Sequence, residues 1–173
     1  AMYTTSGNQN TAVGYLSLYK NTVSDNTAVG AYTLACNTTG TYNTAVGYAS
    51  QNYTNTGGGN TSLGRQALYL NNDGGAHNVA IGTFAMLDNT SGSCNVAVGT
   101  CALCDNTTGG KNVAVGWRSL YNNTTAGSNV AMGREALVSN TTGAQNVAVG
   151  HTSLYTSITG DNNVGIGTCA LYT

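Results

Sequence analysis

Two acidic side chains recur at the same place in successive repeats of this sequence. Asp88 and Asp105 are 17 residues apart, which is the spacing of the motif around them. If each repeat forms one coil stacked on the last, the two carboxyl groups would lie within roughly 5 Å of each other. Such a pair could act as a general acid and base or belong to a calcium site. A solvated turn is the alternative that we favour, and the calcium-binding nonapeptide pattern is absent from the sequence.

Cysteines are the second group of residues that could carry chemistry. They are Cys36, Cys94, Cys101, Cys104 and Cys169. Three of them, in the spacing Cys94-x6-Cys101-x2-Cys104, could act as metal ligands, but no histidine stands nearby. Disulfide bonds among these three would require an extracellular protein, and the odd count leaves a thiol for a neighbouring subunit. Cys36 and Cys169, near opposite ends of the chain, could form disulfide bonds between subunits. Small buried thiols at alanine-like positions are the third interpretation, and we predict no cofactor.

Catalytic arrangements are otherwise missing from the sequence. His77 and His151 fall in different repeats and at different places within them, so that a catalytic or metal-binding pair is not expected. No G-x-S-x-G segment occurs, and the glycines follow the repeat period without forming a phosphate-binding loop. We therefore predict that the protein is not an enzyme.

The composition excludes further classes of function. Only 6% of the 173 residues are charged and the formal net charge is −1, so the chain offers no basic surface for nucleic acid. No apolar run approaches the roughly 20 residues of a membrane-spanning helix. With 40% apolar residues, the chain also differs from disordered proteins. We predict one folded domain over residues 1–173, with neither a nucleic-acid partner nor membrane insertion.

The sequence is organised by a repeat whose marker is the glycine of an Ala-Val-Gly-like unit. The unit occurs ten times, with spacings of 16, 17, 17, 18 and then 17 residues five times. The markers are Gly14, Gly30, Gly47, Gly64, Gly82, Gly99, Gly116, Gly133, Gly150 and Gly167. Four residues before them stand Asn10, Asn26, Asn43, Asn60, Asn78, Asn95, Asn112, Asn129, Asn146 and Asn163. Leucine stands four residues after every marker except in the units of Gln51 and Met86.

This period predicts an all-β protein, a parallel β-solenoid of about ten coils, because 17 residues are too few for a two-helix repeat. Each coil supplies a short strand between turn clusters of Asn, Gly and Thr. Coils spaced at roughly 4.8 Å would make a rod of about 48 Å. Equivalent asparagines would form a ladder of side-chain amides, each bonding the next coil. The marker glycine permits a backbone conformation that a Cβ would resist.

The strand segments indicate which side chains face outward. In Asn-Val-Ala-Val-Gly, alternation places Asn, Ala and Gly on one face and both Val on the other. From Val79 onward both faces are apolar or small, and such a strand needs cover on both sides. We expect a thin core on one side and another subunit on the other; one wide core that contains both Val rows is the alternative. Threonine takes the outer position in the first four units, where the contact would be wetter. These residues are Thr11, Thr27, Thr44 and Thr61.

Five predicted turns carry the acceptor pattern for N-glycosylation, Asn-x-Ser/Thr. Their asparagines, at matching places in the repeat, are Asn37, Asn89, Asn106, Asn123 and Asn140. Glycans there would form a stripe along one edge of the rod, although the same residues are ordinary turn formers. Tyrosine also recurs at one position, where it would pack on the coil or offer a stacking surface for sugars. This row is Tyr19, Tyr69, Tyr121, Tyr155 and Tyr172.

The repeat resembles the head repeats of trimeric autotransporter adhesins and, more closely, the repeats of phage-type and bacterial tail-fibre proteins. The resemblance rests on the pattern Asn-x-Ala-x-Gly-x-x-(Ser/Ala), as at 95–102 and 146–153, and on the segments NTAVGY, AL and NTTG. It covers essentially the whole chain. It implies a left-handed roll, three chains side by side, and attachment at a cell or virion surface. The period of 17 residues is longer than that of the adhesin heads.

Both ends of the chain show the same step of the repeat. Ala1-Met2-Tyr3 resembles Ala170-Leu171-Tyr172, and neither carries a polar cap. Since solenoids need capping repeats, we expect a segment of a longer fibre or a subunit that stacks end to end. The leading prediction is a structural or adhesive extracellular fibre subunit, with further copies of itself and cell-surface glycans as partners. An ice-binding solenoid is the alternative, and a polysaccharide-active β-helix is less favoured because charged residues are scarce.

Overall fold

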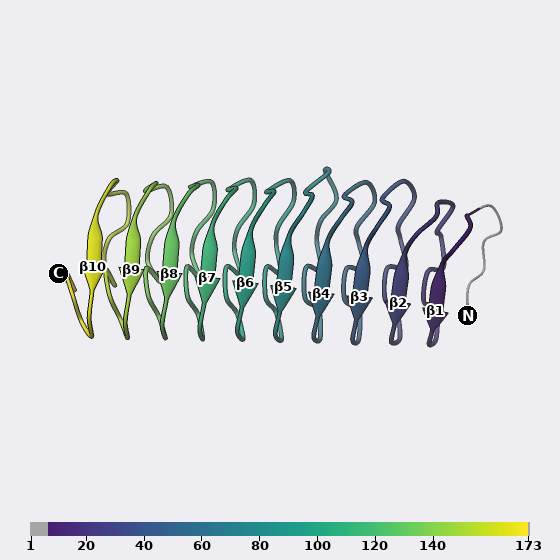
Figure 1. Ribbon diagram of the computed structural model, residues 1–173, viewed down its shortest axis with the longest axis horizontal. Helices are drawn as coiled ribbons and strands as arrows, with labels where there is room; N and C mark the ends of the chain where they lie inside the picture. Colours follow the sequence, from purple (N-terminus) through teal and green to yellow (C-terminus); the bar gives the residue numbers. More distant parts are fainter. Residues whose placement is uncertain (1–6, 173) are drawn as a thin grey trace.

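The computed structural model describes residues 7–172 and shows one rod of stacked coils. Ten strands lie side by side along its long axis (Figure 1). Their order in the sheet follows the chain from β1 to β10, and each strand is parallel to its neighbours. The Ala1-Met2-Tyr3 step lies outside the described residues.

Each strand has three residues and coincides with the Ala-Val unit of one repeat. The strands are β1 (Thr11–Val13), β2 (Thr27–Val29), β3 (Thr44–Val46), β4 (Thr61–Leu63), β5 (Val79–Ile81), β6 (Val96–Val98), β7 (Val113–Val115), β8 (Val130–Met132), β9 (Val147–Val149) and β10 (Val164–Ile166). Equivalent residues pair in register, as Ala97 does with Ala114. The longest spacing leaves this register intact, because Thr61 still pairs with Val79. The structure thus confirms the predicted all-β solenoid, with about nine turns of roughly 17 residues.

Residues with a left-handed backbone turn the chain between strands. After β6, Cys101 has φ 56°, Leu103 has φ 52° and Lys111 has φ 62°. The same three positions are left-handed in coil after coil, and most of them hold residues other than glycine. Because a residue with a Cβ loses roughly 1–2 kcal/mol in this conformation, bonding between coils must offset the strain.

The marker glycines are required by both conformation and space. Gly99 has φ 136°, and a Cβ built on it would lie 2.5 Å from the carbonyl oxygen of Gly116 in the next coil. The contact recurs from Gly14 to Gly150, whereas Gly167 in the last coil has nothing within 4 Å. Glycine at this position therefore sets how closely two coils approach.

The core is narrow and consists of small side chains and one larger apolar residue per coil. The middle residue of each strand from β2 to β10 is Ala, Ser or Gly and is buried. Leu103 and Met86, from the corner after the marker glycine, are fully buried beside these residues. The first and third residues of the strands face outward instead. Both Val rows therefore lie outside the core, and the alternative of one wide core is wrong.

The asparagine before each strand bonds the next coil through backbone groups. Asn26 Nδ2 donates to the carbonyl oxygen of Gly40 at 2.9 Å, and its Oδ1 accepts from the backbone N–H of Asn43 at 3.0 Å. The N–H···Oδ1 distances along this strand ladder are 2.8–3.0 Å. Because the side chains from Asn26 to Asn146 are buried, each of these bonds replaces a contact with water that folding removes.

Candidate interaction surface

The outer face of the sheet carries an apolar row that runs the whole length of the rod. It is made by the third residues of the strands: Val13, Val29, Val46, Leu63, Ile81, Val98, Val115, Met132, Val149 and Ile166. All are half-buried or exposed, with exposed fractions of 57% at Val13 and 44% at Met132. Strands at about 4.8 Å and residues at about 3.3 Å give a face of roughly 480 Å². This area includes the first residues of the strands, four of which are threonines. Contiguous apolar patches of a few hundred Å² on a single chain commonly mark interaction sites.

The first residues of the strands divide this face into two zones. In the hydroxyl zone, β1–β4, the first residues are Thr11, Thr27, Thr44 and Thr61. In the valine zone, β5–β10, they are Val79, Val96, Val113, Val130, Val147 and Val164. The valine zone is therefore aliphatic on both rows, whereas polar and apolar rows lie side by side in the hydroxyl zone.

Tyrosines border the hydroxyl zone. The ring of Tyr32 lies 5.3 Å from that of Tyr15 and 5.9 Å from that of Tyr48, edge to face in both pairs. Tyr15 is 65% exposed and Tyr48 52% exposed. Their rings pack on each other while a large part of each remains in contact with solvent, as is typical of residues that bind partners.

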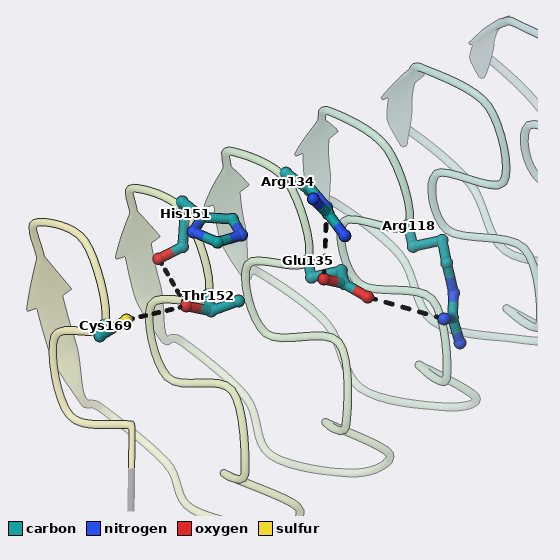
Figure 2. Close-up of polar contacts among 6 residues, drawn as sticks. All are labelled: Arg118, Arg134, Glu135, His151, Thr152 and Cys169. Atoms are coloured by element: carbon teal, nitrogen blue, oxygen red, sulfur yellow. Dashed lines mark hydrogen bonds and ion pairs between the residues drawn. The ribbon is translucent and has the colours of Figure 1, made fainter.

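A tryptophan and two arginines border the valine zone. Trp117 is 42% exposed, and the guanidinium carbons of Arg118 and Arg134 lie 5.3 and 5.0 Å from its ring centroid. Glu135 forms ion pairs with both arginines, at 3.6 Å to Arg118 and 3.4 Å to Arg134 (Figure 2). Arg118 also lies 4.6 Å from the ring centroid of Tyr121. Tryptophan, tyrosine and arginine are the residue types that contribute most to binding at protein interfaces.

A smaller polar contact follows in the next two coils. The hydroxyl of Thr152 donates to the carbonyl oxygen of His151 at 2.8 Å and lies 3.2 Å from Cys169 Sγ (Figure 2). The side chains of His151 and His77 are exposed and belong to coils far apart in the rod. The structure therefore does not bring the two histidines together, in agreement with the prediction that they form no catalytic or metal-binding pair.

The acids Asp88 and Asp105 flank a buried thiol. Burial, and then the charge of Asp105, raise the pKa of Asp88. The same two causes, in the same order, raise the pKa of Cys104 to about 12. Burial also raises the pKa of Cys101. Because the thiolate is the nucleophile, both shifts disfavour reaction at these two cysteines.

All five cysteines are free in the structure. Cys94 and Cys169 are exposed, Cys36 and Cys101 are half-buried, and only Cys104 is buried. The third interpretation of the cysteines, as small buried thiols at alanine-like positions, therefore holds for Cys104 only. Within residues 7–172, no three side chains of His, Cys, Asp or Glu lie close enough together to hold a metal ion.

The five asparagines of the predicted glycan stripe lie inside the coil. Asn37, Asn89, Asn106, Asn123 and Asn140 are fully buried. Asn106 Nδ2 donates to Asn89 Oδ1 at 2.7 Å and to the carbonyl oxygen of Gly109 at 2.9 Å. The nitrogen that would carry a glycan is thus buried and hydrogen-bonded, which contradicts a stripe of glycans on the folded rod.

These asparagines belong instead to a second ladder, which we call the amide ladder. Its members are Asn21, Asn37, Asn71, Asn89, Asn106, Asn123 and Asn140. Here one side-chain amide donates directly to the next, at 2.6–3.1 Å. The amide-to-amide bonding expected of the asparagines before the strands therefore occurs mainly in the amide ladder. Among the asparagines before the strands, Asn163 Nδ2 donates in this way to Asn146 Oδ1 at 3.0 Å.

The contacts around Trp117 were missed by sequence reasoning. The residue types were visible in the sequence, because this coil and the next together contain the one Trp, two Arg and one Glu at variable positions of the repeat. Over the described residues the surface has no pocket of the kind that encloses a small ligand. No helix in that part of the chain is long and apolar enough to cross a membrane.

No family model, no curated protein and no solved structure matches this chain. The resemblance to adhesin and tail-fibre repeats therefore stays a prediction, as do the left-handed roll and the three-chain assembly that it implies. What the chain does has to be argued from the surface just described.

Proposed function

We propose that the chain is a stiff structural subunit of an extracellular fibre, in which copies associate side by side through the outer face of the sheet. The observation that carries this proposal is the apolar row along all ten strands, which the coil's own core does not cover. A sheet that is apolar on both faces is stable in water only when both faces are covered. In-register coils would supply length and stiffness, since each coil packs on its two neighbours.

The two zones contribute unequally to this association. The valine zone has aliphatic side chains on both rows and supplies most of the apolar area. The hydroxyl zone forms a wetter contact, because threonine hydroxyls keep water or need a partner. A second copy of the chain is the partner that fits best, since β-branched residues on two such faces can interdigitate. Location at a cell or virion surface, and attachment to glycans, rest on the resemblance of the repeats.

Paired charges on one zone at a time test the proposal. Val98→Glu with Val115→Glu places two carboxylates in the valine zone, and we expect the dissociation constant of the assembly to rise at least about 100-fold, because each charge would be desolvated. Thr27→Glu with Thr44→Glu is the matched control, on two neighbouring strands of the hydroxyl zone, and we expect a smaller loss. Sedimentation velocity gives the mass, and circular dichroism checks that both variants fold.

Two outcomes would contradict this account. If the unmodified protein stays at the mass of one chain at every concentration, the outer face is not a self-association face. If both charge pairs fold and leave an assembly intact, copies associate through another surface. Electron microscopy of the assembled protein then distinguishes bundles of rods from end-to-end filaments.

Ice binding is the second candidate, and the row of outward threonines is the observation that favours it. Thr11, Thr27, Thr44 and Thr61 stand in register on adjacent strands. The row changes to valine at β5, however, so that fewer than half of the coils present a hydroxyl. Thermal hysteresis of the purified protein would support ice binding, and its absence would remove this candidate.

A further inference from the structure

One coil of the rod has polar side chains where the others have apolar ones. Gln51 stands where seven of the other coils bury a leucine, and Ser62 stands where most strands have alanine. Gln51 Nε2 donates to Ser62 Oγ at 2.8 Å and to the carbonyl oxygen of Thr44 at 3.2 Å. Ser62 Oγ also bonds the hydroxyl of Ser50. We call the residues Ser50, Gln51, Thr54 and Ser62 the polar layer.

The polar layer separates the apolar core into two clusters. The first contains Leu18, Ala28, Leu34 and Ala45, and the second runs from Ala67 to Leu154. Fully buried leucine or methionine thus links coil to coil in the second cluster, while Gln51 interrupts the series after Leu34. Burial of apolar surface is the main stabilising contribution between coils, and this layer lacks the leucine that supplies it in most other coils.

The amide ladder is interrupted in the same coil. Asn37 donates to Asn21 in the first part of the ladder, and Asn89 donates to Asn71 in the second. Thr54 stands between the two parts and its hydroxyl has no partner. Among the described residues four buried side-chain atoms lack a partner, and three of them belong to Gln51, Thr54 and Asn72. Such atoms destabilise a fold, and here they gather within one stretch of the rod.

The backbone continues through the polar layer without a gap. The N–H of Thr44 donates to the carbonyl oxygen of Asn60 at 2.8 Å, and that of Asn60 to Asn43 Oδ1 at 3.0 Å. Strands β3 and β4 remain paired in register. The layer therefore keeps the two parts aligned as one rod while it reduces the free energy that couples them.

We propose that the polar layer is a built-in break point, at which the rod divides into two units that unfold separately. The amino-terminal unit, residues 7–49, opens first, because its core has two fully buried leucines, Leu18 and Leu34, against a longer series in the carboxyl-terminal unit. Repeat proteins unfold as a chain of coupled units, so one weak coupling is enough to separate two transitions. Under heat or mechanical load, the first coils are released while those from β5 onward stay folded.

Hydrogen exchange with mass spectrometry on the intact chain tests this proposal. We expect the backbone amides of residues 7–49 to exchange at least about tenfold faster than those of residues 79–149, through an opening that leaves the second group protected. The repair variant Gln51→Leu, Thr54→Asn and Ser62→Ala restores the repeat at all three positions. It should reduce this difference to less than about threefold and merge two thermal transitions into one. All three side chains are buried in the coil and none is on the outer face of the sheet. A change in self-association would therefore not explain a change in hydrogen exchange.

The matched control moves the polar layer to another coil. Leu103→Gln, Asn106→Thr and Ala114→Ser copy its substitutions at the equivalent positions 52 residues later. We expect a new boundary of exchange between β6 and β7. The repair variant still decides the question if this triple variant does not fold. Uniform exchange in the unmodified protein, or a repair variant with an unchanged boundary, would overturn the proposal.

Discussion

The first four coils and the last six share one backbone but differ on both faces of the sheet. Register, the strand ladder and the left-handed corners are the same in both regions. Outside, threonine gives way to valine at β5; inside, the core is interrupted at Gln51 and continuous from Ala67. The backbone repeat therefore depends on asparagine, glycine and the bonds between coils. It leaves the outer rows free to change along the rod.

The largest effect is expected from a methyl group between two coils. Gly99→Ala would place a Cβ 2.5 Å from the carbonyl oxygen of Gly116, and Gly30→Ala would place one 2.3 Å from that of Gly47. We expect each to lower the free energy of unfolding by more than about 3 kcal/mol. If the two regions unfold separately, Gly30→Ala lowers only the first thermal transition and Gly99→Ala only the second. Calorimetry measures both.

Gly167→Ala is the control for this pair. Nothing lies within 4 Å of its Cβ position, although φ is 120°. Only the conformational cost remains, which is roughly 1–3 kcal/mol. Equal destabilisation by all three substitutions would show that close packing of the coils is not what the glycines provide. A shift of one common transition by both Gly30→Ala and Gly99→Ala would show that the two regions unfold as one.

A smaller effect is expected when the interruption of the amide ladder is copied into the regular region. Asn106→Thr removes the donor to Asn89 Oδ1 and the acceptor for Asn123 Nδ2, and both groups stay buried. We expect a loss of about 1–3 kcal/mol in chemical denaturation, because Asn89 Oδ1 is left buried without a partner, at roughly 1–3 kcal/mol. Asn123 Nδ2 still donates to the carbonyl oxygen of Ala126 at 3.0 Å. The neighbouring half-buried Asn122 provides the control, and Asn122→Thr should change stability by less than about 0.5 kcal/mol. Similar losses of unfolding free energy in the two variants would contradict a stabilising role of the amide ladder.

The smallest effect concerns pH in the valine-zone region. Because the pKa of Cys104 is raised to about 12 from an ordinary value of 9.0, the folded protein holds a proton that the unfolded chain loses. The unfolding free energy therefore falls as pH rises from about 9 towards 12, by on the order of 1 kcal/mol at pH 10. Cys104→Ala should remove this part of the alkaline slope, whereas Cys94→Ala, at an exposed position, should keep it. Identical slopes for both variants would contradict the burial argument.

The repeat allowed most of the fold to be predicted. Spacing alone gave the number of coils and the parallel register, because equivalent residues of a solenoid stack on one another. Alternation correctly placed both Val rows on the face opposite the strand alanine. The left-handed corners could not be predicted, since Leu103 and Cys101 are not residue types that favour such a backbone. They adopt it because the bonds between coils hold the chain there.

The role of individual asparagines was harder to predict. Asn106 lies in an Asn-Thr-Thr-Gly segment that is typical of an exposed turn, yet its side chain is fully buried in the amide ladder. Asparagine suits both environments, because its amide can bond a turn or a copy of itself. The Trp117 contacts depend on which side chains meet across coils. Their residue types stood out in the sequence, but their geometry did not.

The mass of the unmodified protein in solution, measured over about 0.1–100 µM, tests the central claim most directly. If the outer face of the sheet joins copies of this chain, sedimentation equilibrium will show a multiple of 17.5 kDa that dissociates on dilution. A single species of 17.5 kDa at every concentration would mean that the apolar row stays uncovered by further copies, which contradicts the account of this surface.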